Sequence, residues 1–226
     1  MRDASRLRVL VTAGPTYEAL DPVRFIGNHS TGKMGYAVAE AFAGQGADVI
    51  LVSGPTALPD PAHSGIRTVR VTSGREMLAA AEEVAADCHV WVFAAAVADY
   101  RPAEVSATKI KKQGDRLTLE LVKNVDIAAT LGARKRAGEQ FSVGFALETN
   151  DELAHAQGKL RSKNFDLVVL NSLADPGAGF RHDTNKITLV DARGVEVFPL
   201  KPKAGVAADI VAAVLARREE ARLLRP

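Results

Sequence analysis

The chain has 226 residues, of which 47% are hydrophobic and 25% are charged, and its formal net charge is +2 at pH 7. This balance is typical of a globular protein with a sizeable core, and it gives no electrostatic reason to expect nucleic acid as a partner. No segment approaches the run of about 18 apolar residues that a membrane span needs. The first residues lack the apolar region of a signal peptide, and the single Cys88 cannot form an internal disulfide. We therefore expect a cytoplasmic protein without a membrane partner.

Short apolar runs alternate with helical patterns along the chain. The runs predicted to be buried strands are residues 7–11, 49–52, 68–71, 90–95, 142–147 and 167–170. The predicted helices are residues 32–44, 75–86, 151–163 and 205–224. Such alternation predicts an α/β protein with a three-layer Rossmann-like fold, in which a mostly parallel central sheet has helices on both faces. Because we find no linker or internal repeat, we expect one nucleotide-binding domain over residues 1–226.

The helix predicted at residues 32–44 has clear start and stop signals. Its apolar face, by helical spacing, consists of Met34, Ala37, Val38, Ala41 and Phe42. Ser30 and Thr31 are suitable N-caps, and Gly44 and Gly46 can end the helix. Two further strands are expected outside the main alternation: residues 117–121 should pair antiparallel at an edge of the sheet, and residues 187–190 should follow the polar loop that ends at Asn185.

The segment from Val11 to Gly35, VTAGPTYEALDPVRFIGNHSTGKMG, is rich in turn-forming residues and leads into a helix start. The free N–H groups of a helix N-terminus suit a bound phosphate. Gly27–Met34 nearly matches a P-loop, but Met34 stands where a Ser or Thr would hold Mg²⁺, and the strand ends well before the glycines. We therefore favour an anion-binding loop of another kind over a P-loop, with a simple glycine turn as the alternative.

A dinucleotide site of the Rossmann type is a second interpretation. The turn after the first strand reads TAGPTYE and lacks the G-x-G-x-x-G fingerprint. The second strand ends in LVSGPT, without the acidic residue that binds a ribose 2′-hydroxyl. Ser53 could accept a 2′-phosphate, so an NADP-dependent reductase stays open as an alternative.

Three polar loops follow predicted strands, at residues 13–31, 96–112 and 171–185. In open parallel sheets, ligands bind beyond the carboxyl ends of the strands, where such loops meet. The second loop contains Asp99, which could hold a cation or a sugar hydroxyl, or could pair with Arg101. Basic residues form two sets, which are Lys109, Lys111 and Lys112 in one loop and Lys159, Arg161 and Lys163 near a helix C-terminus. Together with Asp99 they suit a polyphosphate with a metal, although a solvated loop and a helix-dipole role are the simpler readings.

Other chemistries lack a signal in the sequence. The five histidines are scattered, with no Cys/His cluster of metal-binding spacing and no nucleophile elbow. Asp183 and Asn185 lie in a polar stretch, where a turn role is the simpler reading. Cys88 flanks an apolar run and is expected to be a half-buried core residue. The residues therefore indicate a nucleotide-binding α/β enzyme without a covalent nucleophile.

The chain resembles the phosphopantothenoylcysteine synthetase (phosphopantothenate–cysteine ligase) family of coenzyme A biosynthesis, in its bacterial type. The matching blocks, in order from Thr12 to Asn185, are TAGPTYEALDPVRFIGNHSTGKMG, LVSGPT, AAAVADYRP, KIKK, LVKNVDI, VGFALETN, KLRSKNFDLVVLN, and GF followed by DTN. The resemblance implies that CTP activates 4′-phosphopantothenate as an acyl-cytidylate with release of pyrophosphate, and that the amine of L-cysteine then displaces CMP. It also implies Mg²⁺ or Mn²⁺, no flavin in this chain, a homodimer, and a decarboxylase that is fused or associated in many bacteria.

The resemblance assigns roles to particular residues. Asn28 and Lys109 are the expected catalytic residues, Asn28 at the acyl-cytidylate and Lys109 in activation by the nucleotide. The expected nucleotide-binding residues are Ala95, Asp99, Lys109, Val125, Asp126, Ile127, Ala128, Phe145, Lys159 and Lys163, and Asp99 is also the candidate metal ligand. The expected phosphopantothenate-binding residues are Asn28, Ser30, Gly32 and Lys33, partly across a dimer interface.

Two positions depart from the family pattern, since Val125 stands where a proline is usual and Thr31 where a serine is usual. ATP in place of CTP, and a nucleotide-binding module without activity, are the remaining alternatives.

Overall fold

The computed structural model describes residues 6–112, 114–148, 150–172 and 182–223. Its centre is an eight-stranded sheet in the order β13-β12-β10-β9-β6-β1-β4-β5. The strands are β1 (Arg8–Ala13), β4 (Asp48–Ser53), β5 (Ile66–Arg70), β6 (Val90–Phe93), β9 (Phe141–Glu148), β10 (Leu167–Ser172), β12 (Thr188–Asp191) and β13 (Gly194–Val197). The first six in chain order are parallel, while β12 and β13 pair antiparallel at one edge. Their spatial order, 3-2-1-4-5-6, is that of dinucleotide-binding folds.

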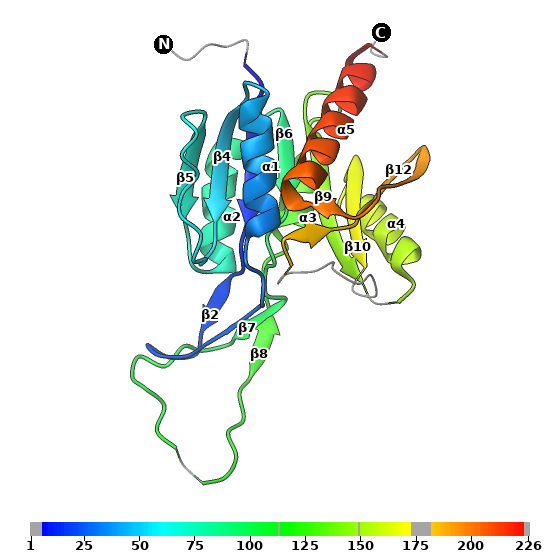
Figure 1. Cartoon of the computed structure of the whole chain (residues 1–226). Helices are drawn as coiled ribbons and strands as arrows, with labels where there is room; N and C mark the ends of the chain where they lie inside the picture. The colour runs from blue at the N-terminus through cyan, green and yellow to red at the C-terminus, as the bar shows by residue number, and fades with distance from the viewer. Residues whose placement is uncertain (1–5, 113, 149, 173–181, 224–226) are drawn as a thin grey trace.

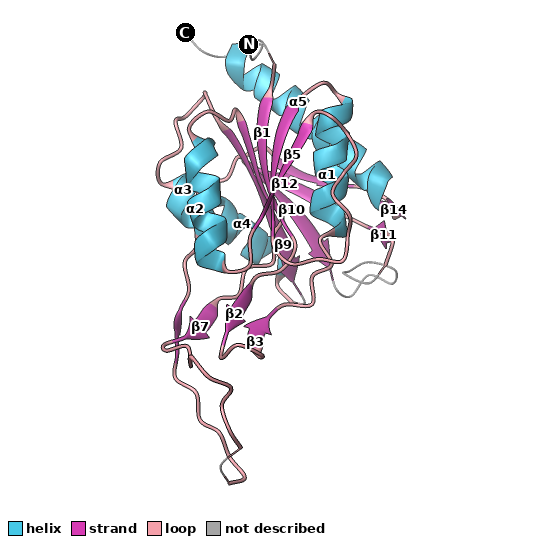
Figure 2. Cartoon of the chain, turned by 90° about the vertical axis from the view of Figure 1, so that its left-hand side faces the viewer, coloured by secondary structure: helices cyan, strands magenta, loops and turns pink. Residues whose placement is uncertain are grey.

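Helices cover both faces of the sheet (Figure 2). One face carries α1 (Lys33–Gly44) and α5 (Lys203–Leu223), and the other carries α2 (Gly74–Ala85), α3 (Ile127–Gly132) and α4 (Glu152–Ser162). The strands alternate their side chains between two apolar clusters, one under each helix layer, as the period of two requires. The predicted three-layer fold is therefore confirmed. Among the described helices, none combines the length and the apolar character that crossing a membrane demands.

Helix α1 begins where it was predicted, but its cap differs. Its N-cap is Gly32, which has a φ of 79°, and no side chain of the described residues caps the first turn, so the expected capping by Ser30 and Thr31 is wrong. The left-handed conformation of Gly32 turns the chain into the helix directly, which a residue with a Cβ adopts only with strain. At the other end, Gly46 also has a positive φ and closes the helix as predicted. The buried residues of the helix include Val38 and Phe42 from the predicted face.

In the described residues, three two-stranded antiparallel sheets lie outside the main sheet, and they were not predicted. They pair β2 (Tyr17–Ala19) with β3 (Phe25–Gly27), β7 (Tyr100–Pro102) with β8 (Leu121–Lys123), and β11 (Thr184–Asn185) with β14 (Lys201–Pro202). Residues 117–121 were expected to form an edge strand of the sheet. Instead only Leu121 is in a strand, and that strand pairs with β7, away from the main sheet.

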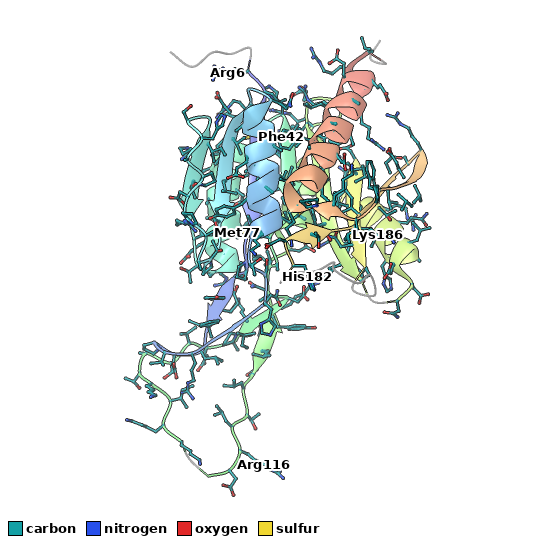
Figure 3. The ribbon with its side chains drawn as sticks, in the orientation of Figure 1. Arg6, Phe42, Met77, Arg116, His182 and Lys186 are labelled. Carbon is teal, nitrogen blue, oxygen red and sulfur yellow. The ribbon has the colours of Figure 1, made fainter. Side chains whose placement is uncertain are left out.

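A long arm leaves the domain between β7 and β8. We call residues 103–112 and 114–120 the arm; Figure 1 shows it extending from the bottom of the molecule, and Figure 3 places Arg116 at its far end. Most of its residues are exposed, among them the apolar side chains of Val105, Leu117 and Leu119. The arm contains Lys109, so one expected catalytic residue lies far from the core of the sheet.

Two features of the core bear on function. Cys88 is 1% exposed, and burial raises the pKa of its thiol to about 11, so this thiol is a protonated core group rather than a nucleophile. The turns after β1 and β4 are in backbone contact, because a Cβ on Gly54 would lie 1.7 Å from the carbonyl oxygen of Pro15. This contact fixes the loop that follows β1.

Candidate nucleotide and phosphate site

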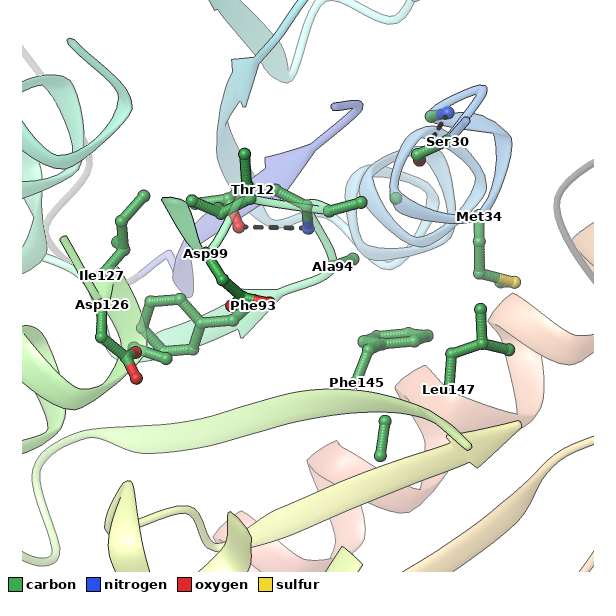
Figure 4. Close-up of a pocket in the computed structure, with 18 of the residues that line it drawn as sticks. Thr12, Ser30, Met34, Phe93, Ala94, Asp99, Asp126, Ile127, Phe145 and Leu147 are labelled. Carbon is green, nitrogen blue, oxygen red and sulfur yellow. Dashed lines mark hydrogen bonds between the residues drawn. The ribbon is translucent and has the colours of Figure 1, made fainter. Parts of the chain in front are cut away.

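A cavity of about 630 Å³ lies across the carboxyl ends of the central strands (Figure 4). Its walls come from the end of β1, the start of α1, the loop after β6, the segment from β8 into α3, the strand β9, and the helices α4 and α5. β1 and β6 are neighbours, and the chain order of the strands reverses between them, which makes this the topological switch point where open α/β sheets bind ligands. The volume is in the range of small-molecule sites.

The first wall is the N-terminus of α1. Gly32, Lys33, Met34 and Gly35 all line the cavity. The helix sits close to the sheet here, since a Cβ on Gly35 would lie 2.6 Å from the Cβ of Ala13. Because no side chain caps the first turn, its N–H groups are open to an anion. The missing cap therefore strengthens the predicted phosphate-binding character of this loop.

The second wall is the loop after β6. Backbone N–H groups of this loop donate to the end of β1 and to the segment after it: Ala95 to Thr12 Oγ1 at 3.4 Å, Ala96 to Gly14 O at 2.9 Å and Ala98 to Thr16 Oγ1 at 3.0 Å. The small side chains leave the backbone open to a ligand. Ala95 and the exposed Asp99 both line the cavity as predicted.

The third wall is the start of α3. Asp126 is the N-cap of this helix, and its carboxylate accepts from the N–H of Ala129 at 3.0 Å. The N–H of Val125 donates to Asn124 Oδ1 at 2.9 Å, a bond that the usual proline could not make. The predicted nucleotide segment, which is Val125, Asp126, Ile127 and Ala128, lines the cavity together with Phe145 from β9.

Each lysine predicted at this cavity is paired with a carboxylate. Lys159 contacts Glu148 at 2.7 Å, Lys163 contacts Asp126 at 3.2 Å, and Lys33 contacts Asp183 at 2.6 Å. The hydrogen bond from Lys33, and then its charge, lower the pKa of Asp183. Because Lys33 belongs to one helix layer and Lys159 and Lys163 to the other, the cavity has cationic groups at both ends.

Asn28 lies at the rim and does not line the cavity. Its Nδ2 donates to Ala96 O at 3.0 Å and to Val97 O at 3.2 Å, so it ties the loop before α1 to the loop after β6. An amide nitrogen has two hydrogens, and both are engaged here. The carboxamide oxygen is therefore the atom that Asn28 can offer to a ligand, as an acceptor.

Lys109 is the other predicted residue that the cavity lining does not include. It is exposed on the arm, next to Ile110. The buried carboxylate of Asp21 accepts from the N–H of Ile110 at 3.1 Å, and Arg24 Nη2 donates to the carbonyl of Ile110 at 2.9 Å. The arm is thus anchored beside the lysine. Ser30, Gly32, Lys33, Ala95, Asp99, Val125–Ala128, Phe145, Lys159 and Lys163 are brought together, whereas Asn28 and Lys109 lie outside the lining.

Three polar residues of the cavity were missed or misread from the sequence. Asn185 Nδ2 donates to Asn171 Oδ1 at 2.9 Å, and both side chains are buried at the cavity wall, so the turn role favoured for Asn185 is wrong. Lys203, at the start of α5, was not considered. Gly179 and Phe180 of the polar loop lie outside the described residues. An Asn at the end of a buried strand is the signal that could have identified Asn171.

The geometry disfavours the dinucleotide interpretation. Ser53, the candidate for a 2′-phosphate, is fully buried, with its hydroxyl 2.9 Å from the hydroxyl of Tyr36 and donating to Gly54 O at 3.0 Å. The chain after β1 enters the β2–β3 hairpin instead of a glycine-rich turn into a helix. The strand order is therefore shared with dinucleotide-binding proteins. The residues that usually bind the ribose and the pyrophosphate of a dinucleotide are not found at the corresponding positions.

These features define the chain as an open α/β protein with a switch-point cavity that is lined by lysines. Residues 4–217 match the family described as the DNA/pantothenate metabolism flavoprotein C-terminal domain. The chain belongs to this family, and the resemblance noted in the sequence is thereby confirmed.

Known relatives support the same placement. A cysteine/cysteine sulfinic acid decarboxylase from an unknown prokaryotic organism is 48% identical over 209 residues, which cover 92% of this chain and 58% of that protein. The coenzyme A biosynthesis bifunctional protein CoaBC of Vibrio cholerae is 47% identical over 206 residues, which cover 90% of this chain and 51% of that protein. A crystal structure of the C-terminal domain of CoaBC superposes with a TM-score of 0.81 at 40% identity, over 97% of this chain and 100% of that one. The chain spans about half the length of the curated relatives it matches.

Proposed function

We propose that the chain is a phosphopantothenate–cysteine ligase that uses CTP. The observation that carries the proposal is one cavity with cationic groups at both ends, Lys33 and the start of α1 at one and Lys159 with Lys163 at the other. Such a cavity suits two anionic substrates whose reacting groups must meet between them. Similarity to CoaBC supports a place in coenzyme A biosynthesis.

In the proposed first step, the carboxylate of 4′-phosphopantothenate attacks the α-phosphorus of CTP, forming an acyl-cytidylate and expelling pyrophosphate. In the second step, the amine of cysteine attacks the acyl carbon, the C–O bond to the cytidylate breaks, and CMP leaves. The protein needs no nucleophile of its own, because the nucleotide supplies the leaving group. Its task is to hold two anions together and to offset their charge.

The residues divide this task. The open N–H groups of α1, with Ser30, Gly32 and Lys33, bind the phosphate of phosphopantothenate. Ala95, the segment Val125–Ala128, Phe145, Lys159 and Lys163 bind the nucleotide. Lys159 and Lys163 exchange their carboxylate partners for phosphate oxygens when the nucleotide enters. Asn28 accepts a hydrogen bond from the cysteine amine through its carboxamide oxygen, and Lys109 reaches the reacting phosphate from the arm.

A divalent metal suits this cavity. Mg²⁺ is commonly held by one or two carboxylates plus substrate phosphates, and Asp99 offers one exposed carboxylate at the cavity. Mg²⁺ or Mn²⁺, when bound, would offset charge on the triphosphate, with Asp99 as its protein ligand. No flavin has a role in the proposed reaction.

We also propose a homodimer built through the arm. Large apolar side chains are exposed on the arm, at Val105 (59%) and Leu117 (59%), on β8 at Leu121 (42%), and on the segment of the β2–β3 hairpin at Val23 (60%) and Phe25 (50%). Exposed apolar side chains of this kind can mark a protein interface. A second copy of the chain would cover them and would place Lys109 near a cavity. In bacteria with the fused form, a decarboxylase domain would be part of the same assembly.

The test is pyrophosphate release with 4′-phosphopantothenate and Mg²⁺, comparing CTP with ATP, with and without cysteine. We expect pyrophosphate release with CTP but not with ATP. When cysteine is added, CMP and the amide should form. Preference for ATP would keep the reaction and overturn the base assignment. Tight CTP binding without release would support a binding module instead, and transfer of hydride from NADPH would support the reductase.

A further inference from the structure

Lys203 is a buried lysine in the wall of the cavity that the roles above do not use. It is the first residue of α5, it is only 8% exposed, and it lines the cavity near Asn171 and Asn185. Hydrogen bonds of its backbone and of its side chain fix its position. Its N–H donates to Asp183 O at 2.9 Å, its Nζ donates to the carbonyl of His182, and the strand β14, which pairs with β11, immediately precedes it.

The surroundings of Lys203 are unusually cationic. Burial is the main cause that lowers the pKa of Lys203, and the charge of Lys33 is the next, while Asp183 acts in the opposite direction. Asp183 itself is committed to Lys33 at 2.6 Å, and its side chain is 86% exposed. Among the described residues, Asp183 is thus the carboxylate whose charge acts on Lys203, and it is already paired with Lys33.

This arrangement lies at the end of the cavity where α1 begins. The uncapped N–H groups of Lys33, Met34 and Gly35 add partial positive charge to that of the two lysines. Keeping two cations together, one of them buried, costs folding free energy. A dianion bound between them would offset this cost, whereas a neutral group would leave it in place.

We propose that Lys203 binds the phosphate dianion of the acid substrate together with Lys33, and that it makes the site select the phosphorylated acid over the unphosphorylated one. The inference rests on the proposed function and deepens it. Lys159 lies in α4 and Lys163 is the C-cap of that helix, on the opposite face of the sheet, so the nucleotide end keeps its own cations. On binding, the phosphate takes the place of Asp183 at Lys33, while Lys203 turns from the carbonyl of His182 to the phosphate.

The experiment compares Lys203→Gln with Lys203→Arg and with Lys201→Gln. Lys201 is a matched control, because it lies two residues away, pairs with Asp209 at 2.6 Å and does not line the cavity. Calorimetric titration measures binding of 4′-phosphopantothenate, of pantothenate and of CTP to each variant. We expect Lys203→Gln to weaken phosphopantothenate binding about 10- to 100-fold, the range for losing one charge-assisted hydrogen bond. Binding of pantothenate and of CTP should stay within about twofold, and Lys203→Arg should retain most of the affinity.

An equal loss for phosphopantothenate and pantothenate would overturn the proposal, because it would show a structural role for Lys203. Unchanged phosphopantothenate binding would overturn it as well. A second measurement tests the role of Lys203 even if the proposed ligase activity is wrong. If the wild-type protein releases no pyrophosphate, the thermal midpoint is measured with and without inorganic phosphate. A rise in the wild type and in Lys201→Gln that is lost in Lys203→Gln supports the phosphate site, and equal rises in all three refute it.

Discussion

The cavity and the arm are built in contrasting ways. The cavity is walled by the ends of parallel strands and by residues of the helices α1, α3, α4 and α5. Its loops are held to one another by hydrogen bonds such as Ala96 N to Gly14 O and Asn28 Nδ2 to Val97 O. The arm is exposed along most of its length, and its described contacts with the domain include the anchor at Ile110 and that of Ser106 N to Leu20 O. The groups proposed to bind substrates are thus preorganised in the core, whereas the lysine proposed for activation lies on the projecting arm.

Replacement of Asn28 by alanine should have the largest effect on the reaction rate. It tests the role of the loops around the cavity, in contrast to that of the arm. We expect Asn28→Ala to retain pyrophosphate release with CTP but to slow amide formation by about 10²- to 10³-fold, as for loss of one group at a reacting centre. Quench-flow measurement of the two half-reactions separates these steps. Equal loss in both would contradict the assignment and would point to disorder of the two loops that Asn28 joins.

Replacement of Lys109 tests the arm side. Lys109→Ala should slow pyrophosphate release by about 10²-fold, while the affinity for phosphopantothenate stays unchanged, because that ligand binds in the preorganised cavity. Lys111→Ala, two residues along the same exposed segment, is the control. Normal pyrophosphate release in Lys109→Ala would remove this lysine from the mechanism.

The anchor of the arm gives a smaller effect. Asp21→Asn should lower the thermal midpoint and slow pyrophosphate release about tenfold, since Ile110 and Arg24 lose their charged partner. The hydrogen bond from Arg24 holds the pKa of Asp21 well below its usual range. A carboxyl with a lowered pKa stabilises the fold above its unfolded-state value of about 3.9, and this contribution is lost as the pH falls further. The difference in midpoint between wild type and Asp21→Asn should therefore shrink below about pH 4; a constant difference would argue against the anchor.

Val125→Pro should have the smallest effect. It restores the residue usual in the family pattern and removes the N–H bond from Val125 to Asn124, at a cost of about 1 kcal/mol in the free energy of unfolding. Pyrophosphate release should stay within about threefold, because Asp126 and the start of α3 keep their places. A loss of tenfold or more would show that this N–H helps to shape the nucleotide end.

The contrast also explains what the sequence could predict. The buried strands, such as residues 49–52, are runs of Val, Ile and Leu, so their positions and the parallel sheet follow from the pattern. The placement of Asp99 follows from the rule on carboxyl ends, whereas Asp126 and Lys159 were expected at the site from the family resemblance. The two-stranded sheets were not predicted because strands of two or three residues carry too few side chains for a period to appear.

Other errors had local causes. The N-cap of α1 was wrongly assigned to Ser30 and Thr31, because the cap is Gly32 in a left-handed conformation. Lys203 was missed because it reaches the cavity from the last helix, and no local pattern marks that distant packing. The location of Lys109 relative to the cavity could not be predicted either, because no sequence pattern in the arm indicates the direction in which the arm projects.

The hydrogen bonds at Ile110 limit the volume in which the Lys109 side chain can move. An unanchored arm would let the lysine explore a volume set by the whole chain between β7 and β8. Anchored at the adjacent residue by both its N–H and its carbonyl, Lys109 explores only the reach of its own side chain. Its effective concentration at any phosphate within that reach is correspondingly higher, and the entropy needed to confine it is lost at folding instead of at each turnover.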